Sequence, residues 1–123
     1  MTTVTFHMEG ERITGFDAAG HSGYAPEGED IVCAAVTSAV RLVEATVNDV
    51  LGLAASVKVR KHDAAILFRL PGSLGPTAES ASQAILAGFM VYLTQLHDEY
   101  PDNVEVLEED GGDAGSSSLS GES

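Results

Sequence analysis

The chain has 123 residues and a net charge of −13, from six Lys and Arg against 19 Asp and Glu. Proteins that bind nucleic acid gain affinity by neutralising phosphates with cations, so this balance argues against a direct nucleic-acid partner. The length suits one domain, and a hydrophobic content of 44% is enough for one core. A single cysteine excludes an internal disulfide. With no leader and no apolar run approaching a membrane span, we expect a cytoplasmic protein without a membrane partner.

The chain opens with a predicted β-hairpin followed by a long loop. Residues 3–8 and 13–16 are rich in strand formers and are joined by a turn at residues 9–12. Residues 17–30 contain several glycines and a proline without periodicity, which predicts a loop, and this loop carries His21. Three glycines of this loop are either ordinary turn residues or part of a flexible flap that closes on a substrate; they are Gly20, Gly23 and Gly28. Tyr24 in the same loop packs either on an apolar substrate side chain or on the core.

Residues 31–51 are predicted to form a helix with one buried face. Apolar residues recur there at helical spacing, at Val32, Val36, Ala39 or Val40, Val43, Val47, and Val50 or Leu51. Asp30 is a suitable N-cap, and Gly52 is a suitable stop signal. Cys33 would then be the third residue of the helix.

The second half of the chain repeats this order. Two strands, at residues 55–61 and 64–70, form a second hairpin, and residues 71–76 interrupt the pattern. A second helix starts at Thr77, and a last strand covers residues 104–107. The predicted core stripe of this helix is Ala81, Ile85, Phe89, Tyr92 and Leu96.

The element order ββ-α-ββ-α-β predicts an α+β fold, with a mixed or antiparallel sheet of about five strands and two helices. One face of the sheet would stay free for a partner or a second copy, so a homodimer is an expectation. We expect the domain to cover residues 1–108. Residues 109–123 are glycine, serine and acids, which cannot bury enough apolar area to become ordered, so they are predicted to be a disordered tail.

Cys33 is the side chain that is best suited to covalent chemistry. A helix N-terminus favours the thiolate, which is the nucleophilic form, and His21 in the preceding loop is a candidate base. Free N–H groups near Cys33 and Ala34 are candidates to hold an oxyanion. The alternative is a buried cysteine that serves only as a small core residue.

A third group that orients His21 has several candidates, for which nearness in sequence is the only argument; they are Asp17, Glu27, Glu29 and Asp30. The role of helix cap is the favoured one for Asp30. The other histidines lie on separate elements with no shared spacing, so we expect surface residues, no metal site and no cofactor; they are His7, His62 and His97.

Residues 20–40, GHSGYAPEGEDIVCAAVTSAV, closely resemble the ribosomal-processing cysteine protease family called Prp. Its hallmark is a Gly-His loop followed by Gly-x-Asp-Ile-Val-Cys-Ala-Ala-Val. The resemblance implies a small dimeric cysteine endopeptidase that removes the N-terminal extension of a bacterial large-subunit ribosomal protein and so supports ribosome assembly. It assigns the nucleophile to Cys33 and the catalytic histidine to His21, with Thr37 where many members have serine. The alternative function is a non-catalytic dimeric module that binds ribosomal or other proteins.

Overall fold

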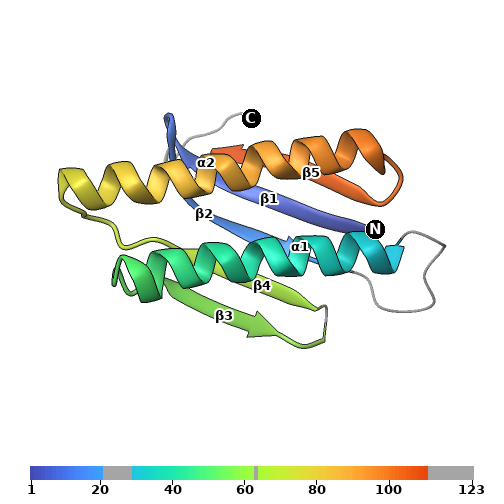
Figure 1. Ribbon diagram of the computed structural model, residues 1–123, viewed down its shortest axis with the longest axis horizontal. Coiled ribbons are helices and arrows are strands. Elements are labelled where there is room, and N and C mark those ends of the chain that lie inside the picture. Colours follow the sequence, from blue (N-terminus) through green and yellow to red (C-terminus); the bar gives the residue numbers. More distant parts are fainter. Residues whose placement is uncertain (21–28, 63, 111–123) are drawn as a thin grey trace.

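The computed structural model describes residues 1–20, 29–62 and 64–110, and it contains one sheet with both helices on the same face (Figure 1). The predicted α+β class and the order ββ-α-ββ-α-β are confirmed. The elements are β1 (Thr2–Glu9), β2 (Arg12–Ala19), α1 (Glu29–Glu44), the π-helical turn η1 (Ala45–Val50), β3 (Ser56–Arg60), β4 (Ala65–Arg69), α2 (Pro76–Glu99) and β5 (Val104–Asp110).

The sheet is mixed, with the strand order β3-β4-β2-β1-β5. β1 and β5 are parallel, whereas the other three pairs are antiparallel. Alternate residues of each strand point to the helices, and the aromatic ones meet in the core. Phe16 of β2 stacks on Phe68 at 5.0 Å between ring centroids and meets Phe89 of α2 edge-on at 4.8 Å. These contacts attach α2 to the centre of the sheet.

Three strands are longer than predicted; β1 gains one residue at each end, and β2 and β5 extend further. β2 continues through Ala19, because residues 15–19 pair with β4 on one side and with β1 on the other. The predicted loop therefore starts three residues too early. β5 continues to Asp110, since Glu108 pairs with Phe6 in the parallel ladder and the next two residues follow in register. The strand thus runs two residues past the expected domain boundary at residue 108, and residues 111–123 lie outside the described residues.

α1 starts earlier and ends differently than predicted. It begins at Glu29, so Asp30 is inside the first turn and is not the N-cap. The α-helix stops at Glu44, and the last predicted turn is the π-helical η1. This change of helical period turns Val50 out to solvent. The chain then leaves the helix at Gly52, whose φ of +67° is the left-handed conformation expected of a helix stop.

The valine stripe of α1 and η1 is confirmed. Five members are buried against the sheet: Val32, Val36, Val40, Val43 and Val47. By length and composition alone, residues Ile31–Val50 are apolar enough to cross a membrane, contrary to the sequence expectation. The buried stripe accounts for much of this apolar character, because the same valines form the contact between helix and sheet.

The buried face of α2 is rotated relative to the predicted stripe. Phe89 and Leu96 are buried as predicted, but Tyr92 is exposed. The other buried positions are one residue beyond the predicted ones, at Ser82, Leu86 and Leu93. The predicted stripe was wrong because α2 has apolar residues on two sides. One side packs on the sheet and the other faces α1, and apolar residues recur at helical spacing on both.

Candidate active site at the start of α1

Cys33 is exposed near the N-terminal end of α1. The interpretation of Cys33 as a core residue is therefore wrong. Its neighbours Val32 and Val36 are buried on the sheet, which fixes the rotation of the helix and keeps the thiol at the surface. Cys33 is thus an accessible thiol on a rigid element, near the positive end of a helix dipole.

The end of β2 lies against this thiol. A Cβ atom placed on Gly20 would be 3.9 Å from the Sγ of Cys33 and 3.7 Å from the Oγ1 of Thr2. Gly20 directly precedes His21 in the sequence. The fold therefore brings the start of the histidine loop to Cys33. The remaining predicted loop residues lie outside the described residues; they are His21, Gly23, Tyr24 and Gly28.

The earlier start of α1 changes the expected position of the oxyanion donors. Cys33 is the fifth residue of the helix, not the third. Only the first four N–H groups of a helix lack helical acceptors, so the N–H groups of Cys33 and Ala34 are in register with the carbonyls four residues earlier. An oxyanion at these two groups would have to compete with helical hydrogen bonds. The hydroxyl-bearing Thr37 lies one turn beyond Cys33 and is exposed.

Asp17, one of the acidic candidates for orienting His21, is excluded by its position in the fold. Asp17 belongs to the face of the sheet opposite the helices, since its neighbours Phe16 and Ala18 are in the core. Burial raises the pKa of Asp17, but hydrogen bonds from Arg69 and His7 outweigh it and hold the pKa below 3.8. Glu27 lies outside the described residues, and of Glu29 and Asp30 the structure describes the helical backbone.

Two of the three histidines that were expected at the surface, His7 and His97, are only partly exposed. His7 is largely buried, with its Nε2 3.0 Å from Asp17 and its Nδ1 3.2 Å from Glu109. The Nδ1 of His97 is 2.7 Å from the carbonyl oxygen of Val104, which links α2 to β5. His62 is exposed as predicted. In the described ranges, no group of three or more His, Cys, Asp and Glu side chains is arranged to hold a metal ion.

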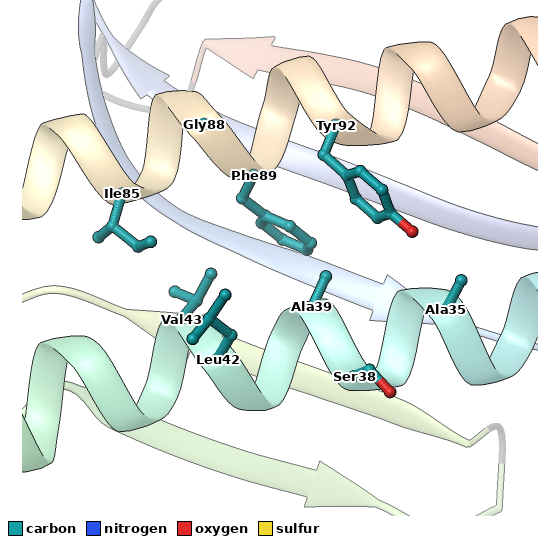
Figure 2. A pocket seen from close by; sticks show the side chains of 9 residues that line it. All are labelled: Ala35, Ser38, Ala39, Leu42, Val43, Ile85, Gly88, Phe89 and Tyr92. Carbon is teal, nitrogen blue, oxygen red and sulfur yellow. The ribbon is translucent and has the colours of Figure 1, made fainter.

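An apolar groove of about 440 Å³ runs between the two helices (Figure 2). Its lining residues are Ala35, Ser38, Ala39, Leu42 and Val43 of α1 and Ile85, Gly88, Phe89 and Tyr92 of α2. Cys33 is not among them. The groove is therefore distinct from the region where Gly20 approaches the thiol.

The scaffold carries an accessible thiol on a helix, which is the kind of nucleophile that a cysteine peptidase needs. A comparison with protein-family models gives the same class, because the model described as cysteine protease Prp matches residues 1–105. The chain therefore belongs to the Prp cysteine protease family. A curated relative, the ribosomal processing cysteine protease Prp of Bacillus subtilis (strain 168), is 31% identical over 94 residues, which are 76% of this chain and 84% of the relative.

Solved structures share the fold. The essential ribosomal processing protease Prp from S. aureus, in complex with a substrate peptide, superposes with a TM-score of 0.77 at 20% identity and covers 89% of this chain and 100% of its own. The same S. aureus protease with a covalently linked product peptide gives a TM-score of 0.68 at 24% identity, with the same coverage.

Proposed function

We propose that this peptidase removes the N-terminal extension of a large-subunit ribosomal protein in the cytoplasm and so supports ribosome assembly. The observation that carries the proposal is the exposed thiol of Cys33 on α1, with Gly20, which precedes His21, packed against it. The substrate class follows the curated relative, whose name describes ribosomal processing, and a structural relative was solved with a substrate peptide.

The proposed reaction uses two side chains and no cofactor. His21 accepts the thiol proton, and the thiolate of Cys33 attacks the scissile carbonyl. The tetrahedral intermediate collapses when the C–N bond breaks and the leaving amine takes the proton from His21. Water then hydrolyses the thioester, which releases the acid product and restores the thiol.

Cleavage of the natural substrate tests this function directly. The protein is mixed with the extended ribosomal protein of its own organism, and the products are followed by mass spectrometry. We expect one cut near the N-terminus, none with Cys33→Ser, and a normal cut with Ser38→Ala, which changes another exposed residue of the same helix. No cleavage by the unmodified protein, or cleavage that survives Cys33→Ser, contradicts the proposal.

Thiol reactivity separates the enzyme from a non-catalytic binding module. In the enzyme, alkylation of Cys33 by iodoacetamide is fast below neutral pH, because the thiolate is paired with a protonated His21. His21→Ala should slow this reaction, whereas His62→Ala, an exposed histidine in the β3–β4 turn, should not. An ordinary thiol profile that His21→Ala leaves unchanged would favour the binding module.

The homodimer belongs to the same proposal, with the helix layer as the contact surface. Large apolar side chains are exposed there, among them Leu42 and Tyr92 beside the groove. The uncovered face of the sheet instead carries the ion pairs of His7 and Asp17. Sedimentation should give a dimer mass, and Leu42→Glu should reduce it to the monomer mass. A monomer at micromolar concentration contradicts the dimer but leaves the peptidase proposal intact.

A further inference from the structure

The hydroxyl of Thr2 is buried without a hydrogen-bond partner. Thr2 is only 3% exposed, and its Oγ1 has neither donor nor acceptor in the described part of the chain. Its backbone is satisfied, because the N–H donates to the carbonyl of Asn103 at 2.9 Å. An unsatisfied buried hydroxyl costs free energy that a valine of the same shape would avoid. The unpaired state of this hydroxyl therefore calls for an explanation.

The location of Thr2 provides an explanation for its unpaired hydroxyl. Thr2, Val4 and Phe6 alternate onto the helix side of β1, and the start of β1 lies at the N-terminal end of α1 (Figure 1). The position where Gly20 would carry a Cβ is within 4 Å of both the Oγ1 of Thr2 and the Sγ of Cys33. Because Gly20 has no side chain, no Cβ atom occupies this position. A rotation of the Cys33 side chain is a way to bring the two atoms closer.

We propose that Thr2 is a positioning residue for Cys33, and that its hydroxyl donates a hydrogen bond to the sulfur in the thiolate state. The threonine keeps its proton throughout; the thiol proton goes to the base, and the O–H group turns toward the negative charge that remains. A hydrogen bond to an ionised acceptor is stronger than one to a neutral acceptor, so this contact favours the thiolate over the thiol. The inference deepens the proposed function, on which it rests.

Two substitutions separate this role from packing. Thr2→Val removes the hydroxyl and keeps the shape, whereas Thr2→Ser keeps the hydroxyl and removes the methyl group. The rate of iodoacetamide alkylation of Cys33 is measured from pH 4 to 10, and thermal unfolding is measured alongside. We expect Thr2→Val to move the midpoint of the alkylation profile up by about half a unit to one unit, which lowers the rate about three- to tenfold at low pH.

Thr2→Ser should keep the original midpoint. Thr2→Val should unfold at the same or a higher temperature, because it removes an unsatisfied buried polar group. A threonine with only a structural role would leave both variants at the midpoint of the unmodified protein, and this outcome overturns the inference. Equal shifts in both variants would assign the effect to packing at this position, because one variant keeps the methyl group and the other keeps the hydroxyl, and would also overturn the inference. If Thr2→Val does not fold, Thr2→Ala against Thr2→Ser provides the same comparison.

The unmodified protein and His21→Ala distinguish failure of this inference from failure of the proposed function. A low midpoint that depends on His21 but not on the Thr2 hydroxyl leaves the dyad intact and removes only the role of Thr2. An ordinary thiol midpoint that does not respond to His21→Ala or to Thr2→Val contradicts both.

Discussion

The two faces of the sheet carry polar groups in contrasting states. On the uncovered face, Asp17 lies 2.8 Å from Arg69 and 3.0 Å from His7, and His7 also reaches Glu109. On the helix-covered face, the hydroxyl of Thr2 has no partner in the described residues, and it lies near the exposed thiol of Cys33. Both regions contain groups with catalytic potential, but the carboxylate of Asp17 lies at ion-pair distance from Arg69 and His7, whereas the hydroxyl of Thr2 has no polar contact in the described residues.

We expect the two regions to have different roles. The contacts of Asp17 with Arg69 and His7 favour one arrangement of these side chains, which stabilises the fold. The thiol of Cys33 is exposed and is therefore accessible to a substrate. The network around Asp17 is therefore expected to contribute to stability, and the region around Cys33 to reactivity.

The largest expected effect tests the reactive region. Cys33→Ala should lower cleavage of the precursor at least about a thousandfold, because no other group supplies the nucleophile. The unfolding temperature should stay within about 2 °C of the original value, since the side chain is exposed and few packing contacts are lost. Mass spectrometry and thermal unfolding measure the two quantities. A large loss of stability would show that Cys33 supports the fold and would weaken the contrast.

The second prediction tests the paired region. Arg69 also donates to the carbonyl oxygens of Phe16 and Phe68 at 3.2 and 2.8 Å, so Arg69→Gln removes several contacts at once. We expect a loss of about 2 kcal/mol in the free energy of unfolding, or roughly 10 °C in the unfolding temperature, with normal cleavage at low temperature. Arg41→Gln, which changes an exposed cation on α1, is the matched control and should have little effect. Lost cleavage in a folded Arg69→Gln protein would link the two faces.

The contrast between the faces could be predicted from the sequence only in part. The valine stripe of α1 was visible because its members repeat at helical spacing and all face one sheet. The exposure of Cys33 then follows from the rotation that the valines fix. The network on the other face was not visible, because its members come from β1, β2, β4 and β5 and meet only through strand register.

Thr2 illustrates a second limit of prediction from the sequence. In the sequence it is one of several strand-forming residues at the start of the chain, and nothing in its spacing separates it from Thr3 or Thr5. Its burial and its nearness to Cys33 depend on the pairing of β1 with β2 and on the placement of α1 over the sheet. The start of α1 was misplaced for a related reason, because Asp is favourable both as an N-cap and within the first turn.

The third prediction uses pH to sharpen the comparison. The folded protein holds the pKa of Asp17 below 3.8, so the charged carboxylate stabilises the fold above that pH, and its contribution is lost as the pH falls through the lowered pKa. Asp17→Asn should therefore be less stable than the original protein at pH 6, by about 1 kcal/mol because the side chain is one-third exposed. The difference should shrink as the pH falls below about 4. Chemical denaturation at several pH values measures it, and a difference independent of pH would exclude the charge of Asp17 as its cause.

The smallest expected effect concerns the outer member of the network. The side chain of Glu109 is 63% exposed, and its contact with the Nδ1 of His7 at 3.2 Å is open to solvent, so screening leaves it a small contribution. Glu109→Gln keeps an oxygen that can accept from the imidazole, and we expect a loss below about 0.5 kcal/mol, with unchanged cleavage. Thermal unfolding in low and high salt measures the loss and its electrostatic part. A loss as large as that of Arg69→Gln would mean that the network depends on its attachment to β5, because Glu109 lies on that edge strand and pairs in register with His7. The stabilising unit would then be the β1–β5 ladder, and not the half-buried pair of Asp17 and Arg69.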